Sequence, residues 1–306
     1  MTISPRVSVI IPTYNRPGLL RETLTSVAAQ TFRDFEIIVV DDGSTVPGVN
    51  DVCQGFLQCR YFHQENAGRS AARNRGIAAA TGDYVAFVDD DDLWKPEKLD
   101  RQVCFLDMHP DIGLVHGPVE VIDENGKSIG ERMMATHPDW YSGDVFRYLL
   151  VGCVVASPTP LMRRGVFDRC GLFDCNLNSS EDHEMWIRIA YKYSFGYIPE
   201  VLAYYRVHGG TTTLADSYLG SYPYIANKLA HWVARKDRYT VRHGVCRGYL
   251  ARILSETPPL SWLRMRHLLH VISVFPPCVM TTKFRDVLLQ GCRSHLAQLW
   301  ARQRTA

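Results

Sequence analysis

The sequence predicts an α/β fold in which a mixed, mainly parallel central sheet is flanked by helices and followed by a helical C-terminal extension. Three short apolar runs, Val7–Ile11, Glu36–Val40 and Tyr84–Val88, have the composition of strands that are buried on both faces. Amphipathic stretches separate the runs, and such strand–helix–strand returns form right-handed parallel crossovers. Polar or acidic residues follow each run, and ligands gather at that edge of a parallel sheet.

The composition is that of a globular chain. Its 306 residues, 46% hydrophobic and 22% charged, can bury one large core or two smaller domains. Nine cysteines without zinc-ligand spacing, and no signal peptide before Val7, predict a reduced, cytoplasmic setting with buried thiols. No apolar run reaches the roughly 18 residues of a membrane span, so we expect the chain not to cross a bilayer by itself.

The first strand ends at Pro12 and leads through the loop Pro12–Pro17 into a helix. Leu20, Leu24 and Val27 fall on one face of that helix, and Pro17 suits its first turn. The second strand then ends in two carboxylates, Asp41 and Asp42.

The segment Glu65–Gly82 predicts a helix with a glycine-marked start and a glycine stop. We expect its arginines near the acidic edge of the sheet, because arginine at a helix N-terminus suits a diphosphate. They are Arg69, Arg73 and Arg75.

Four consecutive carboxylates, Asp89–Asp92, follow the third strand. Two strands of one sheet therefore bring acidic clusters to the same edge. A hard divalent metal that carries phosphates suits oxygen ligands at such a position. The alternative is an exposed acidic turn in which Asp92 caps a helix that begins at Leu93.

The region after Pro96 predicts a further helix and then a strand. Leu99, Val103 and Leu106 share a helical face that ends near Pro110, and Ile112–Ile122 alternates like one strand. Asn125-Gly126 is a hairpin signal. The irregular stretch Met133–Val151 is expected at a binding site, and Ser157–Arg163 is predicted to be a strand.

A helix within Ser179–Gly196 has an apolar stripe that predicts packing on the core. Its first turn holds Glu181, Asp182 and Glu184, which helix capping alone could explain. The segment Ile198–Val207 is predicted to return as a strand that ends at Arg206 and His208.

The C-terminal part of the chain is basic. From Ala226 onward it has 14 Lys and Arg against 3 Asp and Glu, a net charge of +11, whereas the residues before Ala226 carry −9. Tyr218–Ser255 is predicted to be helical, and Ser261–Arg304 contains WLRMRHLLHVISVF. This tail is expected either to pack as a solvated helical extension or to lie on an anionic membrane surface. No nucleic-acid motif accompanies the charge, so no nucleic-acid partner is expected.

Six motifs, spread over roughly residues 5 to 215, resemble the inverting family 2 glycosyltransferases, which have the Rossmann-like GT-A fold. They are PTYNRP (Pro12–Pro17), VVDDGS (Val39–Ser44), NAGRSAARNRG (Asn66–Gly76), FVDDDDLWKP (Phe87–Pro96), EDHEMWIRIA (Glu181–Ala190) and YYRVH (Tyr204–His208). The resemblance implies a nucleotide-sugar donor held by Pro12, Thr13, Tyr14, Arg16, Asp41, Asp42, Asn66, Arg69, Arg73, Asp89 and Asp90.

By the same resemblance, Asp89–Asp91 correspond to the DXD motif of the family, although the extra Asp92 leaves the register ambiguous. Asp91 and Asp89 are then expected to bind Mn²⁺ or Mg²⁺. His208 resembles a histidine that approaches the metal in some members, or it is a strand-end histidine bonded to backbone. Asp182 is implied as the catalytic base, with Glu181 as the weaker candidate.

The resemblance divides the chain into three parts: residues 1–110 as the nucleotide-sugar-binding half, 111–216 as the acceptor-binding half and 217–306 as the basic extension. It implies an inverting transfer to a saccharide or lipid-linked saccharide, in the cytoplasm or at the inner face of the membrane. Two alternatives remain: a nucleotidyltransferase that makes sugar nucleotides, for which PTYNRP is not the expected glycine-rich loop, and a catalytically silent sugar-nucleotide binder.

Overall fold

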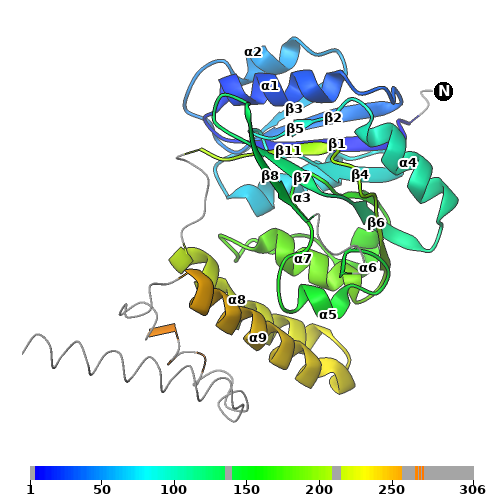
Figure 1. The fold of residues 1–306 in the computed structure, drawn as a ribbon. Helices are drawn as coiled ribbons and strands as arrows, with labels where there is room; N and C mark the ends of the chain where they lie inside the picture. Colours follow the sequence, from blue (N-terminus) through cyan, green and yellow to red (C-terminus); the bar gives the residue numbers. More distant parts are fainter. Residues whose placement is uncertain are drawn as a thin grey trace, which may run out of the picture. The chain divides into compact units, whose positions relative to one another are not determined.

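The computed structural model describes residues 4–134, 140–208 and 215–256, together with residues 266, 267, 269 and 271. The chain divides into two compact units. The first comprises Met1–Leu149 and Cys153–Thr211, and the second comprises Leu150–Gly152 and Thr212–Ala306. Both β-sheets of the described residues belong to the first unit (Figure 1).

The larger sheet has seven strands in the order β10-β6-β9-β4-β1-β2-β3. Four of its six pairings are parallel, and β9 runs antiparallel to both of its neighbours, β4 and β6. The predicted mixed, mainly parallel sheet is therefore confirmed. The strands are β1 (Val7–Thr13), β2 (Phe35–Asp41), β3 (Cys59–His63), β4 (Tyr84–Phe87), β6 (Ile112–His116), β9 (Leu161–Arg163) and β10 (Ser194–Tyr197).

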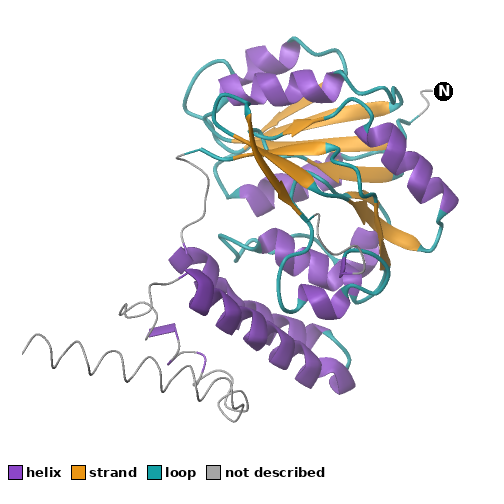
Figure 2. Ribbon diagram, in the orientation of Figure 1, coloured by secondary structure: helices purple, strands orange, loops and turns teal. Residues whose placement is uncertain are grey.

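Helices flank this sheet, as predicted. In Figure 1, α1 and α2 lie on one side of strands β1 to β3, and α3 lies on the other side. Figure 2 shows the same arrangement, with helices on both sides of the strands. The helices of this unit are α1 (Pro17–Ala28), α2 (Val49–Gln54), α3 (Arg69–Ala79), α4 (Lys98–Met108), α5 (Phe146–Leu149), α6 (Val166–Cys170) and α7 (Glu181–Ala190).

A smaller sheet has the order β5-β11-β7-β8. Its strands are β5 (Leu93–Trp94), β7 (Val119–Ile122), β8 (Ser128–Met133) and β11 (Ala203–Arg206). The single strand predicted over Ile112–Ile122 is wrong, because that stretch forms β6 in the larger sheet and β7 in the smaller one. The break falls at Gly117, where an added Cβ would lie 2.6 Å from the carbonyl oxygen of Ile198, and at Pro118, which has no N–H to donate.

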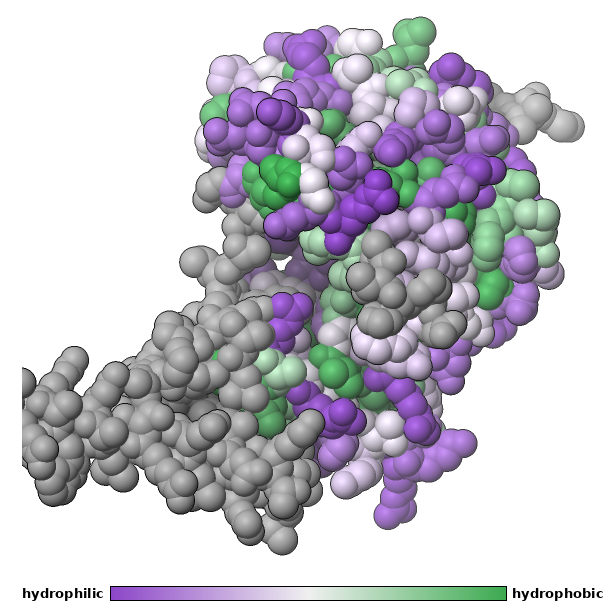
Figure 3. Space-filling model, viewed as in Figure 1, coloured by the Kyte–Doolittle hydropathy of each residue, from purple (hydrophilic) through white to green (hydrophobic). Residues whose placement is uncertain are grey.

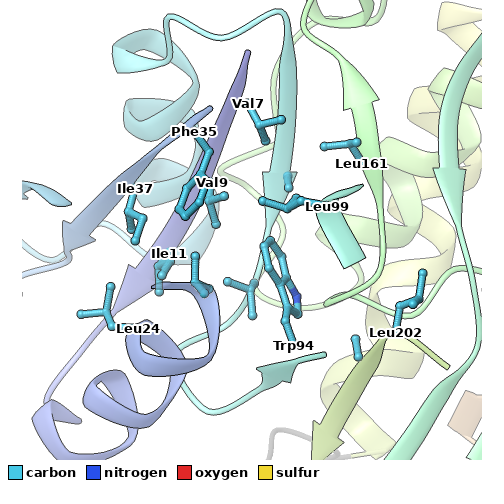
Figure 4. Packing of buried hydrophobic residues seen from close by; sticks show 14 of the residues in the cluster. Val7, Val9, Ile11, Leu24, Phe35, Ile37, Trp94, Leu99, Leu161 and Leu202 are labelled. Atoms are coloured by element: carbon cyan, nitrogen blue, oxygen red, sulfur yellow. The ribbon is translucent and has the colours of Figure 1, made fainter. Parts of the chain in front are cut away.

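Two other predicted strands are shorter than expected. Ser157–Arg163 forms a strand only at Leu161–Arg163, and Ile198–Val207 only at Ala203–Arg206. All seven residues of β1 are buried, and apolar side chains from both sheets join one core cluster. Figure 4 shows side chains that turn toward this common interior from β1, β2, α1 and β5, among them Val9, Ile11, Phe35, Leu24 and Trp94.

Lys98 is a fully buried lysine in this core. Its Nζ donates to Gln102 Oε1 at 2.7 Å and lies 3.9 Å from the ring centroid of Trp94. Burial lowers the pKa of Lys98 well below its usual value. Because the folded protein disfavours the proton that the unfolded chain keeps up to about pH 10.4, Lys98 destabilises the fold most at low pH.

Replacing Lys98 by Met therefore makes a pH-dependent difference to stability. In the pH window between the lowered pKa and about 10.4, the wild-type free energy of unfolding gains about 1.4 kcal/mol per pH unit from Lys98. The variant lacks this gain, so its stability relative to the wild type should fall as the pH rises through this window toward 10. Urea denaturation at several pH values measures this trend, and a constant difference would contradict it.

The second unit is helical within its described residues, as predicted for the extension. It contains α8 (Ala215–Trp232), the 3-10 turn Arg235–Asp237 and α9 (Arg238–Glu256). The rings of Tyr222 and Tyr249 stack with centroids 5.3 Å apart. Most of the amphipathic stretch predicted within Ser261–Arg304 lies outside the described residues.

Among the described residues, no helix combines the length and the apolar character that crossing a lipid bilayer requires. On the face drawn in Figure 3, hydrophobic residues of the described part occur in small groups among hydrophilic ones.

The expectation that the cysteine thiols are buried is only partly right. Cys53, Cys170 and Cys246 are buried, but Cys104 and Cys175 are exposed.

Candidate active site

The end of β2 organises two loops through its carboxylates. Asp41 is buried and accepts from the Tyr61 hydroxyl at 2.7 Å and from the Ser44 backbone N–H at 2.9 Å. Burial raises the pKa of the Tyr61 hydroxyl, and its hydrogen bond to Asp41 adds to the rise. The Asp41 carboxylate therefore holds the turn after β2 against β3.

Asp42 holds the loop before α3 in the same way. Its carboxylate accepts from the backbone N–H groups of Ala67 at 3.0 Å and Gly68 at 2.8 Å, and from the Gln64 side chain at 2.7 Å. The turn can approach this loop because residue 43 is glycine: its φ is +84°, and a Cβ there would lie 2.7 Å from the Asn66 nitrogen. Asn66 is thereby fixed beside the end of β2.

The loop after β1 reaches the same edge of the sheet. Pro12 lies in β1, paired with Val40, and the Thr13 hydroxyl donates to Asp90 Oδ2 at 2.7 Å. The Asn15 side-chain oxygen accepts from the backbone N–H of Thr45 at 2.7 Å. Tyr14, between Thr13 and Asn15 in the chain, is 45% exposed, so an aromatic residue is open to solvent at this edge.

The four carboxylates Asp89–Asp92 make different contacts. Asp89 accepts from Arg73 Nη2 at 2.7 Å. Burial acts to raise the pKa of Asp89, but the positive charges of Arg73 and Arg69 together with the hydrogen bonds to Asp89 outweigh burial, so the pKa is lowered. Asp90 is buried, and burial raises its pKa to about 7 despite the hydrogen bond from the Thr13 hydroxyl.

The side chains of Asp91 and His208 lie together. The Nε2 atom of His208 is 2.9 Å from Asp91 Oδ2, and Arg16 Nη1 donates to the same oxygen at 2.8 Å. The carboxylate of Asp91 is 15% exposed and the His208 side chain 14%. A carboxylate and an imidazole from two distant segments therefore converge at the acidic loop.

Asp92 does not cap a helix, so that alternative is wrong. Leu93–Trp94 form strand β5, and the next helix begins at Lys98. Asp92 is instead fully buried and accepts from the backbone N–H of Arg206 at 2.9 Å. Burial raises the pKa of Asp92 well above its usual value, and the charge of Asp91 adds to this effect.

Arg206 is a positioning residue to which the sequence reading assigned no role. Its side chain is 1% exposed. It donates to the backbone carbonyls of Asp91 at 2.8 Å and Glu124 at 2.9 Å, and to the Glu22 carboxylate at 2.7 Å. It thereby ties the acidic loop to α1 and to the turn between β7 and β8. The YYRVH motif, which contains Arg206, was the sequence signal that could have indicated this role.

Arg73 connects the acidic loop to α7. Its side chain is 2% exposed, and its Nη1 donates to Glu181 Oε1 at 2.7 Å while its Nη2 binds Asp89. Arg69 Nε lies 3.6 Å from the same Glu181 oxygen. Burial raises the pKa of Glu181, although the charge of Arg73 opposes the rise.

Asp182 follows Glu181 in the first turn of α7 and is only partly buried. One of its oxygens accepts from the backbone N–H of His183 at 2.7 Å. Because Glu181 is tied through Arg73 to Asp89, the start of α7 lies beside the acidic loop. The structure thus links the residue beside the predicted base, through Arg73, to Asp89, one of the predicted donor-binding carboxylates.

Of the three arginines of α3 that were expected near the acidic edge of the sheet, Arg75 does not point toward it. Its guanidinium lies over the ring of Phe62, 5.7 Å from the centroid. In a helix, residues two apart point in different directions, so Arg75 faces β3 while Arg73 faces the site.

The family model described as "Glycosyl transferase family 2" matches residues 8–171. The chain belongs to glycosyl transferase family 2. An uncharacterized glycosyltransferase of Rickettsia felis is 40% identical over 213 residues, which cover 69% of this chain and 34% of the relative. One of Methanocaldococcus jannaschii is 30% identical over 246 residues, which cover 76% of this chain and 81% of the relative. The match with the Rickettsia felis protein thus spans about a third of that relative's length.

Solved structures confirm the GT-A fold that the motifs of this family 2 member implied. S. aureus TarS 1-349 in complex with UDP-GlcNAc has a TM-score of 0.69 at 20% identity, covering 95% of this chain and 89% of that chain. The mannosyltransferase PcManGT from Pyrobaculum calidifontis, in complex with GDP-Man and Mn²⁺, has a TM-score of 0.56 at 20% identity and covers 96% and 88%.

Proposed function

We propose that this family 2 member is an inverting glycosyltransferase that moves a sugar from a nucleoside-diphosphate donor to an acceptor hydroxyl. The observation that carries the proposal is the bridge of Arg73 between Asp89 and Glu181. This bridge sets Asp182, a partly exposed carboxylate, next to the carboxylates proposed for the donor. Binding of UDP-GlcNAc by TarS and of GDP-Man by PcManGT supports a nucleotide sugar as donor.

The donor side of the proposed site lies at the ends of β1, β2 and β4. Tyr14 offers an aromatic face for the base, with Pro12 and Thr13 beside it. Asp41, Asp42 and Asn66 shape the surrounding loops. Arg69 and Arg73 place positive charge near the diphosphate, where it stabilises the charge of a leaving group.

The donor set of the acidic loop fits a divalent cation. No three His, Cys, Asp or Glu side chains within the described ranges form a group that could hold a metal by themselves. Mg²⁺ at nucleotide sites nevertheless uses one or two carboxylates and completes its shell with substrate phosphates and water. Asp91 and His208, which lie 2.9 Å apart, would hold Mn²⁺ or Mg²⁺ together with phosphate oxygens of the donor, and Asp89 would add a carboxylate nearby. The metal would supply positive charge to the departing diphosphate. The Mn²⁺ in the PcManGT complex supports this assignment.

On the acceptor side, Asp182 takes the proton of the attacking hydroxyl as the new bond to the anomeric carbon forms. One base is sufficient for inversion, because the acceptor oxygen displaces the diphosphate directly from the opposite face. An α-linked donor would then give a β-linked product. We place the contacts that select the nucleotide, the sugar and the acceptor in the irregular Met133–Ser157 region, of which residues 135–139 lie outside the described residues.

We further propose a role in polysaccharide or glycoconjugate synthesis of the cell envelope, in the cytoplasm. The +11 charge of residues 226–306 supports peripheral contact with an anionic membrane that carries a lipid-linked acceptor. Flotation of the full chain with anionic vesicles, and not with zwitterionic ones, is the expected result. Equal behaviour with both kinds of vesicle would contradict the membrane contact.

Donor binding is tested by a thermal-shift panel of UDP-, dTDP- and GDP-sugars with and without Mn²⁺. A ligand that binds only the folded state at 100 times its Kd adds about 2.7 kcal/mol of stability. One nucleotide class with Mn²⁺ should therefore raise Tm by several degrees, and less without the metal. A panel in which no nucleotide sugar changes Tm would contradict the proposed function.

A further inference from the structure

Arg16 binds the carboxylate that we assign to the metal. Its Nη1 donates to Asp91 Oδ2 at 2.8 Å and lies 3.3 Å from Asp90 Oδ1. The Asp91 oxygen is also the one that His208 approaches at 2.9 Å. A guanidinium and a divalent cation cannot both occupy the same side of one carboxylate oxygen, because their charges repel and their positions overlap.

We propose that Arg16 is an exchangeable counter-cation of Asp91, and that a metal shared by Asp91 Oδ2 and His208 displaces Arg16 when it binds. This inference rests on the proposed function, since it takes Asp91 as a metal ligand. Metal alone then binds weakly. Metal together with a nucleoside diphosphate binds well, because the displaced guanidinium gains a diphosphate as its new partner, and arginine binds such oxygens with two parallel hydrogen bonds.

Among the arginines whose side chains contact the acidic loop in the described part of the chain, Arg16 is the one built to move. Arg73 is 2% exposed and fixed between two carboxylates. Arg206 is 1% exposed and bonded to three separate segments. The side chain of Arg16 is 35% exposed, and its backbone is anchored immediately before Pro17, where α1 begins. Exchange therefore requires only a rotation of the side chain.

The test is a titration of Mn²⁺ alone, and then of Mn²⁺ with UDP or GDP, followed by the electron paramagnetic resonance signal of free Mn²⁺. In Arg16→Gln, Mn²⁺ alone should bind about tenfold tighter, because a like charge a few ångströms away is removed. The factor by which the nucleotide strengthens Mn²⁺ binding should shrink correspondingly. Arg16→Lys keeps the charge and should stay close to the wild type for Mn²⁺ alone.

Arg75→Gln is the matched control, because it removes the same charge from an exposed side chain that lies over the ring of Phe62, outside the site. If Mn²⁺ binds more tightly to Arg16→Gln and not to Arg75→Gln, the result supports the exchange. An unchanged or weaker affinity in Arg16→Gln, or an equal gain in Arg75→Gln, would overturn it. Wild-type protein that shows a donor-induced Tm shift but binds no Mn²⁺ would also overturn the exchange, while leaving nucleotide-sugar binding intact.

Discussion

Replacing Asp182 by Asn should lower turnover by a factor of about 10² to 10⁴, the usual contribution of a positioned general base. The amide keeps the size of the side chain but cannot accept the proton of the acceptor hydroxyl. Donor binding should be unchanged, because the donor contacts proposed above come from β1, β2, β4 and α3. Release of nucleoside diphosphate measures turnover, and the donor-induced shift of Tm measures binding.

The neighbouring Glu181→Gln variant separates this role from a structural one. Glu181 is 2% exposed and engaged by Arg73, so its replacement should lower the free energy of unfolding as well as activity. Asp182→Asn should lower activity alone. Full turnover with normal donor binding in Asp182→Asn would show that the base is assigned wrongly.

Replacing Arg73 by Gln should destabilise the fold by about 3 to 5 kcal/mol, the cost of removing one partner from a buried ion pair. The loss should be large because two carboxylates, Asp89 and Glu181, share this one buried guanidinium. Urea denaturation measures it. Arg75→Gln, in the same helix with an exposed side chain, is the control and should change stability by less than about 0.5 kcal/mol.

The effect of Arg73→Gln should also depend on pH. Arg73 helps to hold the pKa of Asp89 in the folded protein below its usual value. The ion pair therefore contributes stability at pH values above about 3.9, the pKa of Asp in the unfolded chain. This contribution is lost as the pH falls through the lower pKa of Asp89 in the folded protein. The difference between wild type and variant should therefore be largest near pH 6 to 7 and shrink below about pH 4. A difference that grows toward acid pH would rule out the ion pair as its cause.

The sequence predicted the larger sheet well because its strands carry their own signal. Val7–Ile11 and Glu36–Val40 are buried on both faces, so apolar composition alone marks them. β3 was missed because Cys59–His63 is only partly buried and mixes polar with aromatic residues. β5 was missed because two residues, Leu93 and Trp94, are too short to show a period.

The candidate site was predictable as a set of residues but not as a set of contacts. Acidic residues at strand ends predict which edge of the sheet carries the site. The hydrogen-bond partner of each carboxylate, by contrast, depends on segments far away in the chain. Asp92 illustrates this, since an aspartate before an apolar residue has the pattern of a helix cap. Its actual partner is the backbone of Arg206, 114 residues later, and no local pattern encodes that pairing.

The short acidic segment joins β4 of the larger sheet to β5 of the smaller sheet. Each end of the segment is therefore anchored to a different layer, and Arg206 fastens its middle to the β7–β8 turn. If one sheet shifts relative to the other, the position of the Asp91 carboxylate should change before that of other site residues. Heat-sensitive loss of activity should then arise from substitutions in the β7–β8 hairpin, remote from every reacting atom, before the protein as a whole unfolds.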